Sequence, residues 1–116
     1  MVLEPYNTVF AEAFNKTATT VHAIAVEKGW WEGTRNEGEL IALMHSELSE
    51  ALEGLRHGNP HSEHISEFSA VEEEFADVLI RIMDHAMYKG YRVGEAVEAK
   101  IKFNASRAYK HGGKAF

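Results

Sequence analysis

Two short acidic motifs stand inside segments that are otherwise apolar. Glu47 and Glu50 lie three residues apart in one segment, and Glu74 and Asp77 repeat that spacing in another. On a helix, side chains three residues apart leave on nearly the same side, so each motif brings two carboxylates together. One such pair alone is unspecific, because glutamate favours helices and usually lies on a solvated face.

The neighbours of these acids repeat at helical spacing and are apolar. They are Leu40, Leu43, Met44, Leu48, Ala51 and Leu55 around Glu47, and Val71, Phe75, Val78, Leu79 and Ile82 around Glu74. A buried carboxylate is costly unless it is paired or bound to a metal. If the two segments are facing helices, four carboxylates share a pocket, and protons or a cation must relieve their repulsion. An all-oxygen ligand set favours Mg²⁺ or Mn²⁺ over Zn²⁺ or copper.

A set of groups suited to a nucleotide follows near the C-terminus. Lys100, Asn104 and Arg107 are spaced by four and three residues, so one helical face can present all three. Lysine and arginine suit phosphate oxygens, and an asparagine amide suits a base or sugar edge. Each also has an ordinary structural explanation, such as a snorkelling Lys100 or a helix C-terminal charge for Arg107.

Four more residues are candidates for substrate contacts. Arg35 and Arg81 are further phosphate ligands, although Arg81 follows Asp77 by four residues and a local ion pair explains it equally well. Trp30 and Trp31 are adjacent in a glycine-flanked loop. They either seal the end of the helices or form a stacking wall for a nucleobase.

Four amphipathic segments position these residues. The expected helices span about 6–28, 37–57, 69–89 and 93–109. Asn36 with Glu39 and Ser69 with Glu72 are capping pairs, and Gly90 after a lysine is a helix stop. No segment alternates with period two, so no sheet is expected. The sequence predicts a single all-α domain over 1–116, a four-helix bundle or a pair of helical hairpins.

Composition narrows the classes of function. With 116 residues, the chain is small enough that association of copies would add much of its burial. A net charge of -6 argues against binding of nucleic acid polymers or anionic membranes. The absence of cysteine excludes disulfides and thiolate metal sites. No apolar run has membrane-spanning length and no secretory signal pattern is present, so a cytoplasmic location is expected.

The motifs taken together resemble the MazG-like all-α nucleoside triphosphate pyrophosphohydrolases. The succession is Glu47-x-x-Glu50, then Glu74-x-x-Asp77, then Lys100-x-x-x-Asn104-x-x-Arg107-x-Tyr109, and it covers nearly the whole chain. Segments 45–53 and 73–81 are similar to the two signature helices of that family. One departure is Ser46, where many members carry another glutamate.

The resemblance implies Mg²⁺-dependent hydrolysis of a nucleoside triphosphate to the monophosphate and pyrophosphate. Carried over by position, the metal ligands would be Glu47, Glu50, Glu74 and Asp77, and the nucleotide contacts Lys100, Asn104 and Arg107. Glu47 or Glu50 would accept a proton from the attacking water. The resemblance also implies homodimers or homotetramers with a four-helix core and sites completed across subunits. House-cleaning of noncanonical or excess deoxynucleotides follows by analogy alone.

Other interpretations of the acids compete with this one. A non-catalytic helical assembly module would use them as surface charge. A two-iron redox bundle usually needs Glu-x-x-His pairs, and neither acidic pair has histidine at that offset. His57, His61 and His64 offer a separate metal site in the link between the second and third helices. That site is less favoured, because loop histidines are usually solvated and no cysteine joins them.

Overall fold

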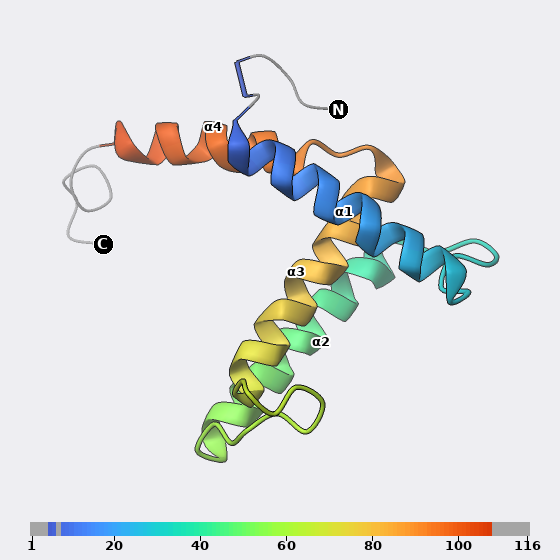
Figure 1. Ribbon diagram of the computed structural model, residues 1–116, viewed down its shortest axis with the longest axis vertical. Helices are drawn as coiled ribbons and strands as arrows, with labels where there is room; N and C mark the ends of the chain where they lie inside the picture. Colours follow the sequence, from blue (N-terminus) through green and yellow to red (C-terminus); the bar gives the residue numbers. More distant parts are fainter. Residues whose placement is uncertain (1–4, 7, 108–116) are drawn as a thin grey trace.

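The computed structural model describes residues 5–6 and 8–107 and confirms the all-α prediction (Figure 1). Its helices are α1 (Val9–Glu27), α2 (Glu37–Arg56), α3 (Ala70–Lys89) and α4 (Val93–Ala105). Over these residues there is no strand, only an isolated antiparallel bridge between His61 and Ser69. Tyr109, the last residue of the basic motif, lies outside the described residues.

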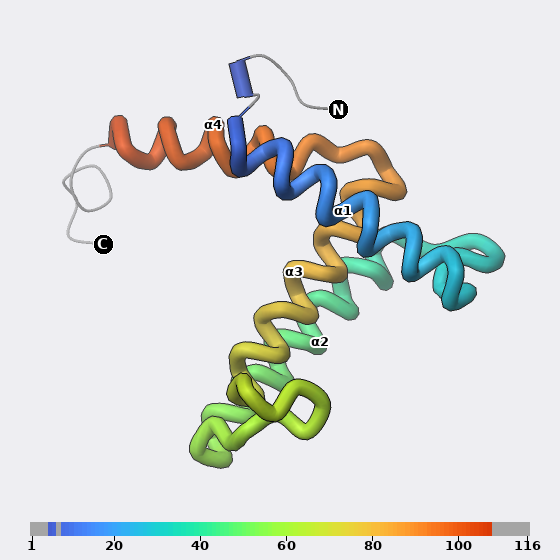
Figure 2. The backbone as a smooth tube through the Cα atoms, in the orientation of Figure 1, coloured from blue at the N-terminus to red at the C-terminus, as the bar shows by residue number. Residues whose placement is uncertain are grey.

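The four helices are arranged around one antiparallel pair. α2 and α3 lie side by side and form a long hairpin, as the acidic motifs require. Figure 2 shows α1 crossing the end of this hairpin where α2 begins and α3 ends. α4 packs against α1 and extends away from the hairpin. The acidic pair of helices and the basic helix therefore occupy different arms of the single chain.

Local capping explains where most helices begin and end. The Asn36 side chain accepts a hydrogen bond from the Glu39 amide at 3.1 Å. Ser69 forms a reciprocal capping box with Glu72, and Gly90 ends α3 in the left-handed conformation at φ 74°. All three signals were predicted from sequence, and the bounds of α2 and α3 agree with prediction to within one residue.

Two predicted helix ends are wrong. The first helix begins at Val9 rather than near Tyr6, because Thr8 is extended and its hydroxyl accepts the Ala11 amide at 3.1 Å. The fourth helix ends at Ala105 rather than continuing through Arg107. There the Ser106 hydroxyl donates to the Phe103 carbonyl at 2.7 Å and competes with helical hydrogen bonding.

The apolar core of the single chain is small. Its buried apolar residues are Ala11, Phe14, Ala18, Leu40, Ala51 and Ala86. Several members of the predicted apolar stripes are about half exposed, among them Leu48, Leu55, Phe75 and Leu79. α4 reaches this core through Gly94, where an added Cβ would lie 3.2 Å from the Phe14 side chain. The hairpin therefore keeps exposed apolar side chains that none of the four described helices covers.

The link between α2 and α3 is held by its own hydrogen bonds. The Asn59 side chain accepts the Val71 amide at 2.9 Å, and the Ala70 amide donates to the Pro60 carbonyl at 2.7 Å. Ser62 is buried, and its hydroxyl donates to Glu73. These contacts hold the first half of the link against the start of α3.

Candidate metal and nucleotide site

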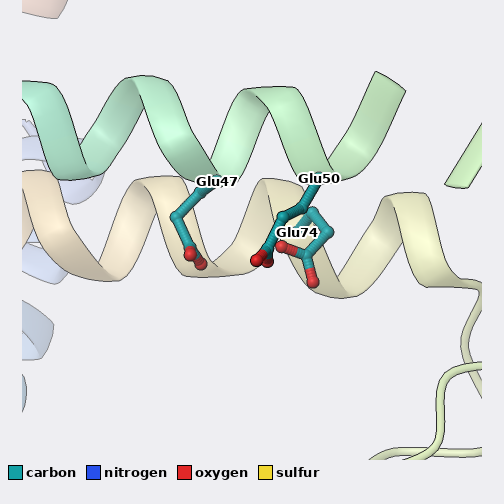
Figure 3. Close-up of side chains that lie close together, drawn as sticks. All are labelled: Glu47, Glu50 and Glu74. Atoms are coloured by element: carbon teal, nitrogen blue, oxygen red, sulfur yellow. The ribbon is translucent and has the colours of Figure 1, made fainter. Parts of the chain in front are cut away.

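The two acidic motifs meet between α2 and α3. Figure 3 shows Glu47 and Glu50 leaving α2 and Glu74 leaving α3 toward the same space. One carboxylate oxygen from each of these three residues lies within 4.8 Å of the others. Asp77 faces Glu47 and is close enough to share a hydrogen bond with it. The structure thus brings together all four carboxylates predicted as metal ligands.

Burial within this cluster is uneven. Glu47 is only 9% exposed, Glu74 is partly buried, and Glu50 is exposed. One oxygen of Glu74, Oε2, is buried and has no hydrogen-bond partner among the described residues. The one ion pair that reaches the four acids there is long, 3.9 Å from Arg81 Nη2 to Glu47 Oε1. Four acids share the space with a single, distant cation.

The electrostatics follow from this crowding. Burial raises the pKa of Glu47, and the hydrogen bond and charge of Asp77 raise it further. Burial also raises the pKa of Glu74 to about 7, reinforced by the hydrogen bond and charge of Glu50. In both residues burial and the neighbouring acids favour the neutral form, and the charge of Arg81 opposes this shift only at Glu47. A divalent ion would relieve the same repulsion, and a buried, unpartnered carboxylate oxygen among all-oxygen donors fits Mg²⁺ or Mn²⁺.

A fifth acid joins the cluster but is occupied. Glu73, with Glu74 and Asp77, forms a second group whose oxygens lie within 4.8 Å of one another. Both Glu73 oxygens are already bonded, one to the Ser62 hydroxyl and the other to His64 Nδ1 at 2.8 Å. These bonds lower the pKa of Glu73. Sequence reasoning missed this residue, and its position beside Glu74 was the one signal of it.

A cavity of about 380 Å³ opens beside the carboxylates. Its walls come from α1, the loop after it, α2 and α3, and are formed by Val21, Ile24, Ala25, Trp30, Arg35, Glu47, Asp77, Ile80, Arg81 and Asp84. Three predicted substrate contacts, Trp30, Arg35 and Arg81, therefore share one cavity with two predicted metal ligands. Its volume lies within the range of small-molecule sites.

The adjacent tryptophans have different surroundings. Trp31 stacks on Tyr88 with ring centroids 4.0 Å apart, and the Arg35 guanidinium lies 4.9 Å from the Trp31 ring centroid. Its indole nitrogen donates to Asp84 Oδ1 at 2.9 Å. Trp30 is 59% exposed and lines the cavity. Trp31 is thus enclosed by protein groups, whereas Trp30 offers a free ring.

Two cavity-side residues were not found from sequence. Asp84 lines the cavity, and its Oδ1 contacts His22 Nδ1 at 2.7 Å as well as the Trp31 indole. Asp84 follows Asp77 by seven residues, a spacing that keeps both on one face of α3. That spacing was the available signal. His22 had none, because its contact with Asp84 spans 62 positions of the chain.

The basic residues of α4 lie elsewhere in the single chain. Lys100, Asn104 and Arg107 are all exposed. Lys100 Nζ lies 4.5 Å from the centroid of the Phe103 ring, and the Arg107 guanidinium lies 5.8 Å from it. Because α4 packs on α1 rather than on the hairpin, one copy of the chain does not bring these residues to the carboxylates.

The histidines of the α2–α3 link do not gather into a metal site. His64 is bonded to Glu73, and His57 Nδ1 lies 3.3 Å from Glu53. Within residues 5–6 and 8–107, the groups close enough to hold a metal contain glutamate and aspartate only. The all-carboxylate cluster is therefore the better candidate.

Comparisons with known proteins identify no relative of this chain. Searches against protein-family models, curated proteins and solved structures found no significant match. In the described part of the chain, no helix combines the length and apolarity that crossing a bilayer requires.

Proposed function

We propose that the protein is a Mg²⁺-dependent nucleoside triphosphate pyrophosphohydrolase, which converts a (deoxy)nucleoside triphosphate and water to the monophosphate and pyrophosphate. The observation that carries this proposal is the cluster of four carboxylates beside a cavity that also contains two arginines and an exposed tryptophan. The order of the motifs, which resembles the MazG-like family, supports the same reaction. Such an enzyme would meet its substrates in the cytoplasm.

The roles divide along the cavity. At the α2–α3 end, Glu47, Glu50, Glu74 and Asp77 would hold the metal. When bound by these carboxylates, a divalent ion would supply positive charge that offsets the charge of the triphosphate and would activate a water. Arg81 and Arg35, which line the cavity, suit the remaining phosphate oxygens. Trp30 would stack on the base at the other end.

The reaction itself is an in-line displacement. Water attacks the α-phosphorus, and the bond from that phosphorus to the oxygen bridging the α- and β-phosphates breaks. Pyrophosphate leaves with the bonding electron pair, and the proton of the water passes to a carboxylate. We assign the proton acceptor to Glu47 or Glu50.

We further infer that the working molecule is a homodimer or homotetramer. On α2, exposed apolar side chains recur at spacings of seven, four and three: Ile41, Leu48, Leu52 and Leu55. Phe75 and Leu79 on α3 are exposed as well. Two such hairpins would bury their faces against each other as a four-helix core. In that assembly, Lys100, Asn104 and Arg107 of one copy are available to the phosphates held by another.

The exposed apolar face also favours a second candidate, a non-catalytic assembly module. In that case nucleotide and Mg²⁺ would have no effect on stability. The enzyme predicts the opposite, since a ligand bound only by the folded form raises the melting temperature by mass action. A thermal melt with nucleotides and Mg²⁺ therefore separates the two candidates.

Turnover gives the direct test. Ribo- and deoxynucleoside triphosphates are incubated with Mg²⁺ or Mn²⁺, and monophosphate and pyrophosphate are measured. Glu47→Gln and Asp77→Asn should abolish release, while Glu53→Gln, an exposed acid on the same helix as Glu47, should leave it unchanged. Absence of turnover with every nucleotide, or full activity in both site variants, would overturn the proposal.

A further inference from the structure

The cavity contains one acidic group that the proposed chemistry does not use. Asp84 lies seven residues beyond Asp77 on α3, a separation of ~10 Å along the helix axis. That distance is about the length of a nucleoside. If phosphates occupy the carboxylate end, Asp84 lies near the base, on the same cavity as the exposed ring of Trp30.

Asp84 is held in a fixed orientation. His22 from α1 and Trp31 from the following loop both contact the same oxygen, Oδ1, at 2.7 and 2.9 Å. Trp31 is itself held by its stack on Tyr88. An indole N–H only donates, so Oδ1 of Asp84 acts as an acceptor. Among the described residues no hydrogen bond reaches Oδ2, and this oxygen is left for a ligand.

We propose that Asp84 selects the nucleobase by accepting a hydrogen bond from its exocyclic amino group at Oδ2. This inference rests on the proposed function and narrows its substrates to amino-bearing bases. A carboxylate accepts but does not donate. Cytosine places an N–H donor where uracil places a carbonyl, whose lone pairs would face the Asp84 oxygen. Adenine and hypoxanthine differ in the same way.

Matched substrates provide the test without any variant. We compare kcat/KM for CTP with UTP, dCTP with dUTP, and ATP with ITP, all with Mg²⁺. The members of each pair differ in an amino or a carbonyl group at the same ring position and in whether the adjacent ring nitrogen carries a hydrogen. We expect the amino member of at least one ring class to be preferred by about tenfold or more, since the carbonyl of the other member would face the carboxylate oxygen without a hydrogen bond. Ratios near one in every pair would overturn the proposal.

Asp84→Asn then assigns the preference to the side chain. An amide both donates and accepts, so the variant should reduce the ratio to within about threefold. Glu72→Gln, an exposed acid on the same helix, serves as the control and should keep the wild-type ratio. An unchanged ratio in Asp84→Asn would contradict the proposal. So would a changed ratio of CTP to dCTP alone, because it would place Asp84 at the sugar.

Binding separates this inference from the proposed reaction. If no triphosphate is hydrolysed, the proposed function fails. Equilibrium binding of CMP against UMP, and of AMP against IMP, to the wild-type protein then decides the role of Asp84. Tighter binding of the amino member of either pair supports base selection by this residue, whereas equal or absent binding in both pairs overturns it.

Discussion

Acids on the same pair of helices occupy opposite electrostatic environments. Glu37, at the start of α2, contacts His85 Nε2 at 2.8 Å, accepts the Tyr91 hydroxyl and lies 3.8 Å from Lys89 Nζ. The hydrogen bond from Tyr91 is the main reason that its pKa is lowered. Halfway along the same helix, burial raises the pKa of Glu47, and the hydrogen bond and charge of Asp77 raise it further.

α3 repeats the contrast between adjacent residues. Glu73 is bonded to Ser62 and His64 and has a lowered pKa, whereas the pKa of Glu74 is raised to about 7. The helix, the residue type and the neighbourhood in sequence are the same. The difference comes from which groups other elements place around each carboxylate. We infer that the acids with hydrogen-bond donors from other residues stabilise the fold, and that the acids without such donors are available to bind a ligand.

The largest expected effect is on catalysis. Glu74→Gln removes a charge and a ligand oxygen from the cluster and should reduce pyrophosphate release by ~100-fold or more. Glu37→Gln removes an acid that already has protein partners and should keep activity within about threefold. Steady-state kinetics of both variants with Mg²⁺ would check this. Equal losses of activity in the two variants would contradict the distinction between acids that have hydrogen-bond donors from the protein and acids that lack them.

The pH dependence of stability should also separate the two kinds of acid. A carboxyl whose folded pKa lies above its unfolded value of 4.5 destabilises the fold as pH rises through that interval. For Glu74 this interval runs from 4.5 to about 7. In the absence of metal, ionisation of Glu74 should therefore lower the free energy of unfolding by ~1–2 kcal/mol between pH 5 and pH 8, allowing for solvent screening.

Chemical denaturation with chelator at several pH values measures this cost. Glu74→Gln should flatten the decline toward pH 8. The lowered pKa of Glu37 and Glu73 acts with the opposite sign, since stability from these acids is present above pH 4.5 and is lost as pH falls. The raised pKa of His64 adds stability below pH 6.5 that is lost as pH rises through its folded value, and Glu74→Gln keeps this part. An identical pH profile in the variant and the wild type would contradict the assignment of Glu74.

Mg²⁺ should offset part of this loss. At pH 8, Mg²⁺ at ten times its dissociation constant should stabilise the wild-type fold by ~1.4 kcal/mol, and chelator should reverse the effect. Mg²⁺ should stabilise the Asp77→Asn variant less than the Glu73→Gln variant, since Glu73 already has two hydrogen-bond partners and is not needed to hold the ion. Equal shifts in these two variants would place the ion elsewhere.

The partnered acids should show their effect in stability alone. Glu73→Gln weakens its bonds to Ser62 and His64 and should lower the melting temperature by ~2–5 °C. Pyrophosphate release should persist at temperatures below the transition. Differential scanning fluorimetry together with activity measures both properties. A loss of turnover in a folded Glu73→Gln protein would instead make this acid part of the site.

The smallest effect is expected for an acid paired in open solvent. Glu53 lies 3.4 Å from Arg56 on α2, and both side chains are more than half exposed. Arg56→Gln should change the free energy of unfolding by ~0.5 kcal/mol or less. A larger change in the free energy of unfolding would mean that solvent exposure does not distinguish weak ion pairs from stabilising ones.

Much of the fold follows from local rules. Asn36, Ser69 and Gly90 set helix ends through contacts within a few residues, and these are readable in sequence. The convergence of the carboxylates was also predictable, because a three-residue spacing on two facing helices leaves few arrangements. The error at Ser106 has the same local origin, a side-chain hydrogen bond that the apolar pattern does not reveal.

Other features of the site depend on contacts between distant residues. The bond from Trp31 to Asp84 spans 53 positions, and it decides which of two adjacent tryptophans remains free. Helical periodicity carries no information about such a partner. The direction of α4 is likewise set by packing, at Gly94 against Phe14. The sequence shows which residues share a face, but not which face another helix will cover.

The hydrogen bonds that hold the α2–α3 link determine where the chain can tolerate insertions. Each residue inserted into a helix turns everything beyond it by about 100°. An insertion between Ser69 and Glu74 would thus swing the α3 acids out of register with Glu47. An insertion at Ile65 would only enlarge the tip beyond the His61–Ser69 bridge, leaving α3 in its place. Natural or engineered variants should therefore tolerate extra residues at the tip of the link but not in the first turn of α3.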